Sequence, residues 1–110
     1  GPATTILKYS WAGGPQNRMD MKVNRKVTVI NKLGLHARAS AQLVKLAGTY
    51  ASDVRLTLGE RSVDGKNIMG LMMLAATCGS RIMVTAEGED AGQAVERIDA
   101  LFSERFGEPE

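Results

Sequence analysis

Hydrophobic and polar positions alternate with a period of two along several short stretches of the chain. In "SDVRLTLGE", Val54, Leu56 and Leu58 share one side, and the residues between them are mostly polar. Alternation of this kind is typical of a half-buried strand, and Gly59 supplies the backbone freedom for a hairpin turn. The pattern predicts four strands, over residues 25–31, 52–60, 61–64 and 81–88.

Three further stretches repeat their apolar residues at the spacing of three and four that marks a helix face. They predict helices over residues 36–50, 67–79 and 89–107. Gly48 weakens the last turn of the first helix, Asn67 is a favourable first cap of the second, and Gly79 is its expected stop. The order βαββαβα, with a hairpin in the middle, favours an α+β fold in which helices cover one face of an antiparallel sheet.

The first twenty residues, "GPATTILKYSWAGGPQNRMD", follow neither period and carry two of the three prolines. The stretch lacks the positive-then-apolar order of a secretory signal, and no apolar run in the chain approaches the about 18 residues of a membrane span. We interpret residues 1–20 as a tag, linker or disordered extension, and residues 21–110 as one domain. A native docking peptide around Trp11 is the alternative.

Charge and composition exclude several classes of function. The formal net charge is +2, with only one excess positive charge after residue 20, and there are only five aromatic residues. This is a poor footprint for a nucleic-acid-binding protein. One cysteine, Cys78, allows no internal disulfide, and one cysteine with one histidine is an uncommon set for zinc. We expect a cytoplasmic monomer without metal or cofactor, which binds neither nucleic acid nor membrane.

His36, the only histidine, lies at the start of the first predicted helix. The first N–H groups of a helix lack intrahelical partners and favour an anion such as phosphate. An imidazole is partly neutral near pH 7 and is then a nucleophile. The N–H groups of Ala37, Arg38 and Ala39 could receive phosphoryl oxygens, with the guanidinium of Arg38 adding charge-assisted bonds. A lone histidine here is more often a cap or a solvated residue, so the residues alone leave both interpretations open.

The second predicted helix is apolar on every side. Ile68, Leu71 and Met72 can form one face, and Met69 and Met73 another. One face can enter the core, and the other must be buried elsewhere or exposed. Methionine is an adaptable contact residue, so an exposed face would suit docking of a partner. Burial of both faces in a small core is an equally good interpretation.

Two motifs together carry a resemblance to a known family. "GLHARAS" at residues 34–40, followed by "GKNIMGLMMLAA" at residues 65–76, resembles the histidine-containing phosphocarrier protein HPr and its nitrogen-branch relatives, NPr. The resemblance extends over residues 23 to about 106 and implies an open-faced β-sandwich of four antiparallel strands and three helices. It implies that His36 is phosphorylated on Nδ1, with Arg38 as the family arginine beside it. Enzyme I is then the donor and an Enzyme IIA-type protein the acceptor, so the chain is a carrier rather than an enzyme.

Two positions depart from the family pattern. Ala39 stands where proline is common, which keeps the first turn helical. Asn67 stands where a regulatory serine is often found, which puts serine-based regulation in doubt. The docking face we expect combines the first two helices through the residues Gln42, Lys45, Asn67, Ile68, Met69 and Met72. A regulatory module, whose phosphorylation state controls enzymes or transcription factors, is the alternative function, and the sugar and nitrogen branches both stay open.

Overall fold

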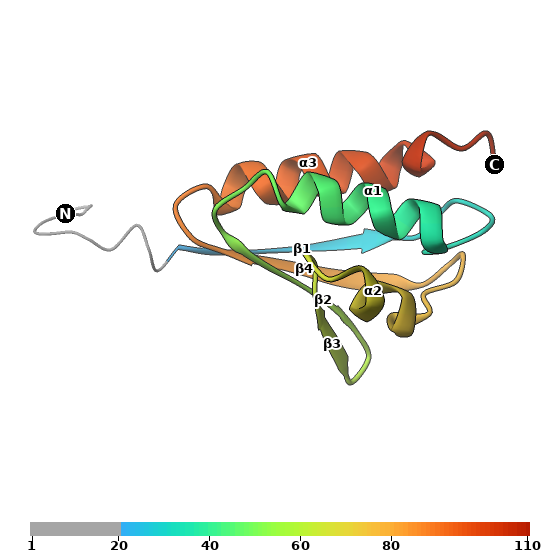
Figure 1. Cartoon of the computed structure of the whole chain (residues 1–110), viewed down its shortest axis with the longest axis horizontal. Coiled ribbons are helices and arrows are strands. Elements are labelled where there is room, and N and C mark those ends of the chain that lie inside the picture. The colour runs from blue at the N-terminus through green and yellow to red at the C-terminus, as the bar shows by residue number, and fades with distance from the viewer. Residues whose placement is uncertain (1–20) are drawn as a thin grey trace, which may run out of the picture.

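The structure is a computed structural model that describes residues 21–110, and the expected tag or linker of residues 1–20 lies outside the described residues. The elements follow the predicted order βαββαβα, with one short 3-10 helix added at the end. Their bounds are β1 (Lys22–Thr28), α1 (Ala37–Ala47), β2 (Asp53–Leu58), β3 (Arg61–Asp64), α2 (Ile68–Leu74), β4 (Arg81–Glu87), α3 (Ala91–Ser103) and η2 (Arg105–Gly107) (Figure 1).

The four strands form one antiparallel sheet in the order β1-β4-β2-β3. Val27 is opposite Ile82 and Leu56 is opposite Val84 in the register, so the apolar positions of neighbouring strands fall on the same face. The helices cover this face, with α1 and α3 side by side along the sheet and α2 against α1 and β3 (Figure 1). The predicted open-faced β-sandwich is confirmed.

The core lies between the sheet and the helices. Its largest fully buried side chains are Phe102, Leu43, Leu56, Leu71, Leu74, Ile82 and Ile98. At the end of α3, Phe106 of η2 packs edge to face on Phe102, with 4.9 Å between the ring centroids. Phe106 is itself buried, so the core fixes the place from which the C-terminal residues leave the domain.

The second helix ends earlier than the sequence predicts. It stops at Leu74 rather than at Gly79, because Ala75 adopts a left-handed conformation with φ 55°. The carbonyl of Ala76 then accepts a hydrogen bond from the N–H of Leu35 at 2.9 Å. The segment after α2 is thus used to hold the loop that precedes α1.

Asp90 joins the start of α3 to the loop that follows α1. Its carboxylate accepts hydrogen bonds from the N–H groups of Ala51 and Ser52, at 2.8 and 2.9 Å, and from the Ser52 hydroxyl. The bond from the Ser52 hydroxyl, followed by that from the Ala51 N–H, holds the pKa of Asp90 below its usual range. Gly88 makes this approach feasible, because a Cβ there would lie 2.5 Å from Ser52 Oγ.

The Asp90 contacts should make the stability of the domain depend on pH. A carboxylate whose pKa is depressed on folding stabilises the fold above its unfolded pKa of about 3.9, and this contribution is lost as the pH falls through the lower folded value. Urea unfolding should therefore show that Asp90→Asn is less stable than the parent at pH 7 and loses less stability on acidification. The exposed neighbour Glu89→Gln is the control. Parallel pH profiles for Asp90→Asn and the parent would contradict this expectation.

Candidate functional site

His36 is the N-cap residue of α1. Its backbone is extended, with φ −76° and ψ −178°, and its carbonyl accepts the first helical hydrogen bond from the N–H of Ser40 at 2.8 Å. The ring nitrogen Nδ1 accepts a hydrogen bond from the N–H of Arg38 at 3.3 Å. The imidazole therefore caps the helix, and the same contact directs Nδ1 at the helix N-terminus. Capping and phosphoryl acceptance, the two alternatives of the sequence, are compatible in this geometry.

The loop before His36 depends on Gly34. This residue has φ +68°, and a Cβ on it would lie 2.5 Å from the carbonyl oxygen of Ala76. Glycine alone adopts this conformation at little cost and also leaves room for the backbone of the segment after α2. The two motifs seen in the sequence thus meet in space, since "GLHARAS" begins at Gly34 and "GKNIMGLMMLAA" ends at Ala76.

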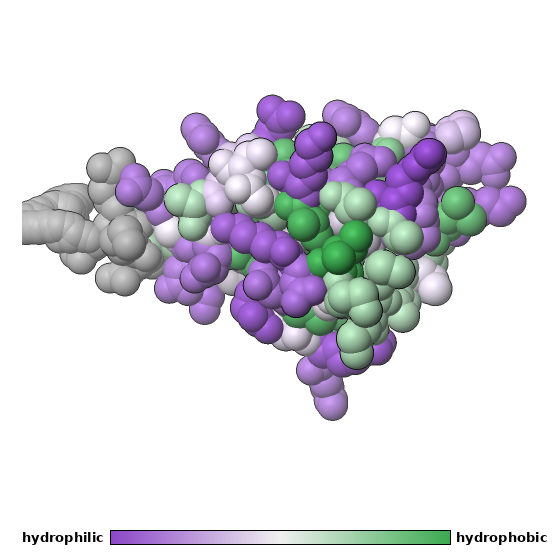
Figure 2. Space-filling model, viewed as in Figure 1, coloured by the Kyte–Doolittle hydropathy of each residue, from purple (hydrophilic) through white to green (hydrophobic). Residues whose placement is uncertain are grey.

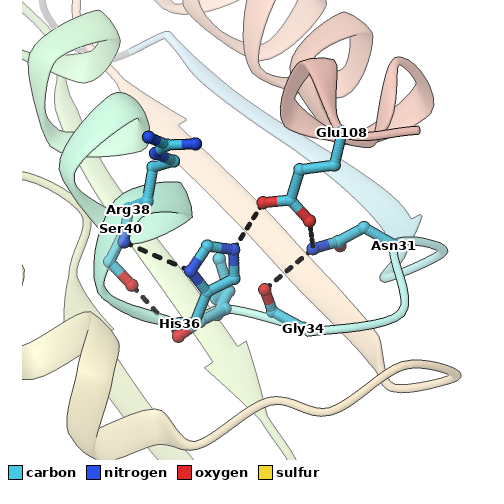
Figure 3. A network of polar contacts seen from close by, with 7 residues as sticks. Asn31, Gly34, His36, Arg38, Ser40 and Glu108 are labelled. Carbon is cyan, nitrogen blue, oxygen red and sulfur yellow. Dashed lines mark hydrogen bonds and ion pairs between the residues drawn. The ribbon is translucent and has the colours of Figure 1, made fainter. Parts of the chain in front are cut away.

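Asn31 and Glu108 complete the surroundings of the imidazole, and neither was among the predicted site residues. Glu108 Oε2 contacts Nε2 of His36, and Glu108 Oε1 accepts a hydrogen bond from Nδ2 of Asn31 at 3.0 Å (Figure 3). The fully buried Asn31 also donates to the carbonyl of Gly34 at 2.9 Å. The hydrogen bonds from Asn31 and then from His36 hold the pKa of Glu108 below its usual range, and the charge of Arg38 adds to this shift.

The predicted phosphate cradle lies in the first turn of α1. Ala37, Arg38 and Ala39 are the first three helical residues, whose N–H groups have no intrahelical carbonyl partner. The Arg38 guanidinium is exposed and, within residues 21–110, makes no hydrogen bond or ion pair. His36 and Arg38 also border an open hollow of about 400 Å³, together with Leu33 and the C-terminal residues 108–110.

One face of α2 is exposed, which decides between the two interpretations of this helix. Leu71 and Leu74 are fully buried, whereas Met69 and Met73 are 62% and 72% exposed, and Ile68 and Met72 are also exposed. We call Ile68, Met69, Met72 and Met73 the α2 patch. Figure 2 shows apolar side chains gathered over this part of the molecule. The predicted docking residues omitted Met73, although its spacing of four from Met69 places both on one helix face.

The other predicted docking residues lie elsewhere. Gln42 and Lys45 line a groove of about 440 Å³ between α1 and α3, together with Arg97 and Glu104. Because α1 contacts both α2 and α3, this groove and the α2 patch lie on different flanks of α1. Asn67 is exposed at the start of α2, where its Oδ1 accepts a hydrogen bond from the N–H of Gly70 at 3.2 Å. Its predicted role as the cap of this helix is confirmed.

Comparison with known proteins agrees with the fold and with the two motifs. The family described as "PTS HPr component phosphorylation site" matches residues 23–104. The chain belongs to the HPr family. The Phosphocarrier protein HPr of Cupriavidus necator is 50% identical over 88 residues, which cover 80% of this chain and 99% of that relative. The Phosphocarrier protein NPr of Shewanella violacea is 38% identical over 87 residues, which cover 79% and 96%.

A solved structure supports the same assignment. HPr-C-His from Thermoanaerobacter tengcongensis superimposes with a TM-score of 0.78 at 32% sequence identity, covering 80% of this chain and 99% of that chain. Membership of the HPr family makes the chain a phosphocarrier of the phosphotransferase system rather than a catalytic enzyme. In residues 21–110 there is no helix with the length and hydrophobicity needed to cross a membrane.

Proposed function

We propose that His36 accepts one phosphoryl group on Nδ1 from phosphorylated Enzyme I and passes it to an Enzyme IIA-type acceptor. The observation that carries this proposal is the direction of Nδ1, which faces the N-terminus of α1 and accepts the N–H of Arg38. A nitrogen that accepts a hydrogen bond has its lone pair available at that position. The His36 side chain is 27% exposed, so a partner can reach the ring while Glu108 contacts its Nε2 edge.

The helix N-terminus suits the phosphorylated state as well as the unphosphorylated one. Once Nδ1 is bonded to phosphorus, its lone pair no longer accepts the Arg38 N–H. That N–H can then donate to a phosphoryl oxygen one bond further out, and the N–H groups of Ala37 and Ala39 are its neighbours in the first turn. The partial positive charge of the helix N-terminus favours the added anion. Transfer then needs little reorganisation of the protein, because the donors are already in place.

The α2 patch is the surface we propose for partner docking. An exposed apolar centre is typical of the middle of a protein–protein interface, and methionine adapts to more than one partner. A carrier must bind its donor and its acceptor in turn, which requires such adaptability. The exposed basic side chains of Arg38 and Lys45 lie on α1, with Lys45 on its α3 side, and would suit acidic groups on a partner that reaches beyond the patch.

Phosphorylation of the purified chain tests the proposed function. Incubation with phosphoenolpyruvate and Enzyme I should add the mass of one phosphoryl group, measured on the intact protein. The adduct should be lost in acid and retained in base, as expected for phosphorus bonded to nitrogen. An absence of any mass gain, in a reaction that charges a control HPr, would reject the proposal. Offering sugar-specific and nitrogen-branch acceptors to the charged chain would then identify the branch.

Arg38→Ala should slow transfer more than it weakens docking. The guanidinium is exposed and without a partner in residues 21–110, so its charge is available to the phosphoryl group as negative charge moves onto the oxygens. We expect the transfer rate at saturating Enzyme I to fall at least about tenfold, with the dissociation constant changed by less than about threefold. Rapid-quench single-turnover measurements separate the two quantities.

Arg55→Ala is the matched control for Arg38→Ala. It removes the same charge from the uncovered face of the sheet, where Arg55 contacts Ser62, and should leave transfer unchanged. Arg38→Lys keeps the charge but loses the planar fork, so an intermediate rate is expected. An unchanged rate with weakened binding would assign Arg38 to recognition instead of chemistry.

A further inference from the structure

A chain of oriented hydrogen bonds leads from the backbone of Gly34 to His36. The carbonyl of Gly34 can only accept, so the Asn31 group that contacts it at 2.9 Å must be the amide nitrogen Nδ2. The same nitrogen has a second hydrogen, which it donates to Glu108 Oε1 at 3.0 Å. The amide of Asn31 is therefore fixed in orientation, and it donates a hydrogen bond to one of the two carboxylate oxygens of Glu108.

The other oxygen of Glu108 determines which ring nitrogen of His36 carries the proton. An ionised carboxylate can only accept hydrogen bonds, and the Asn31 amide that donates to Oε1 favours this ionised form of Glu108. The Nε2 atom that Oε2 contacts must therefore be an N–H donor (Figure 3). From the opposite side of the ring, the N–H of Arg38 points at Nδ1, which must accept. Two independent contacts thus require the same neutral tautomer, with hydrogen on Nε2 and a lone pair on Nδ1.

The C-terminal tail holds Glu108 in this position. Phe106 is buried, the N–H of Glu108 donates to the carbonyl of Arg105 at 2.9 Å, and the carbonyl of Glu110 accepts the N–H of Lys32 at 3.0 Å. The tail is thereby attached on both sides of Glu108, whose side chain is only 13% exposed. The contact between Glu108 and His36 is therefore fixed by the packing of the folded domain.

We propose that Glu108 is a positioning residue that holds His36 in the Nε2–H tautomer and so presents the Nδ1 lone pair to the incoming phosphorus. This inference rests on the proposed function of His36. The family resemblance alone supplied Nδ1 as the acceptor atom, and Glu108 supplies a physical reason for that choice. A carboxylate is required because Asn31 and His36 each present a hydrogen, and glutamine offers only one acceptor oxygen.

The transfer step balances without a further proton acceptor. The Nδ1 lone pair forms the new N–P bond while the bond between phosphorus and the donor's leaving group breaks, and the leaving group departs with its electron pair. The proton stays covalently bound to Nε2 and hydrogen-bonded to Glu108 Oε2. The carboxylate stabilises the positive charge that develops on the ring. Onward transfer to the acceptor reverses each of these changes at His36.

Within residues 21–110, the other charged side chains that border the hollow beside His36 and Glu108 are those of Lys32, Arg38 and Glu110. Arg38 approaches from α1, and Lys32 approaches from the loop that precedes α1. Lys32 pairs with the carboxylate of Glu110 at 3.4 Å, and both side chains are largely exposed. Glu110 is two residues from Glu108 on the same tail, and within residues 21–110 its carboxylate pairs with Lys32 and not with His36. Glu110→Ala is therefore a matched control, which removes a carboxylate and leaves the backbone contact with Lys32 in place.

Nitrogen NMR of the imidazole tests the proposal directly, without Enzyme I. His36 is the only histidine, so labelling with ¹⁵N-histidine gives one pair of ring signals. At a pH where the ring is neutral, the parent and Glu110→Ala should show protonated Nε2, unprotonated Nδ1 and an observable Nε2 proton. In Glu108→Ala the Nε2 proton should be lost to exchange with water, and the nitrogen shifts should move toward the tautomer mixture of free imidazole.

Phosphotransfer supplies the second readout. Glu108→Ala should lower the rate at saturating Enzyme I roughly tenfold and leave the half-saturating concentration within about twofold, because the reacting atom is misplaced and the docking face is not. The phosphotransfer rate of Glu108→Gln should also be lower than that of the parent. An unchanged Nε2 signal in Glu108→Ala, an unchanged rate, or an equal loss in Glu110→Ala would each overturn the assignment. If His36→Ala were still phosphorylated, the proposed function would fail instead, and the tautomer result would be unaffected.

Discussion

His36→Ala should abolish phosphorylation of the chain completely. The variant contains no histidine, so no second imidazole can substitute for the first. Intact-mass measurement after incubation with phosphoenolpyruvate and Enzyme I should show only the unmodified protein. This is the largest effect expected of any single substitution, because it removes the atom that forms the bond to phosphorus rather than a group that assists it.

A second variant separates the loss of chemistry from a loss of structure. His36→Ala also removes the cap of α1, which costs about 1 kcal/mol of stability. Asparagine is a good N-cap residue, so in His36→Asn an amide oxygen can accept the N–H of Arg38 in place of Nδ1. His36→Asn should therefore retain the stability of the helix and still accept no phosphoryl group. Phosphate found on either variant would assign the reaction to another residue.

The elements of the fold were predictable because each has a strong local signal. The period-two strands and the amphipathic helices specify their own inward faces, and the structure buries Val54, Leu56, Ile98 and Phe102 as the patterns require. The end of α2 was not predictable in this way. Ala75 has no special propensity for a left-handed conformation. Its left-handed conformation is accompanied by a tertiary contact, in which the carbonyl of Ala76 accepts the N–H of Leu35 in the loop before His36.

The candidate site was predictable only on one side of the imidazole. Arg38 and the first turn of α1 are adjacent to His36 in the sequence, so helix geometry alone places them. Glu108 lies 72 residues further along the chain, in a tail without any periodicity, and nothing local links it to His36. Asn31 was visible inside "NKLGLHARAS", but its role depends on being buried beneath Glu108. Contacts of this kind become visible only when the fold brings the C-terminus beside the loop that precedes α1 (Figure 1).

The α2 patch could not be predicted from the sequence alone either, because its apolar residues would fit a buried core as well as an exposed surface. The structure separates the two sets by burying Leu71 and Leu74 against the rest of the domain. The apolar pattern of this helix predicted docking through Ile68, Met69 and Met72, and the exposed fraction adds Met73 to them. Gln42 and Lys45, on the α3 side of α1, stay predictions whose contribution to docking must be measured separately.

Replacing Met69 and Met73 together by alanine should weaken binding of Enzyme I about 30-fold. Their side chains are 62% and 72% exposed, so they contribute little to the core, and the melting temperature should stay close to that of the parent. At an interface they would be buried, and a central apolar anchor is worth about 2 kcal/mol, which corresponds to this change in the dissociation constant. The transfer rate at saturating Enzyme I should be unchanged, because neither residue belongs to the hydrogen-bond network around His36. Isothermal titration calorimetry and single-turnover kinetics measure the two quantities.

Met83→Ala is the matched control for this double variant. Met83 is a half-buried methionine of β4 on the uncovered face of the sheet, where no docking is proposed. Its replacement should leave the dissociation constant for Enzyme I unaltered. If the α2 double variant bound Enzyme I as tightly as Met83→Ala does, the α2 patch would not be the docking surface. The groove between α1 and α3 that holds Gln42 and Lys45 would then be the next surface to mutate, since it is the other flank of the helix that carries His36.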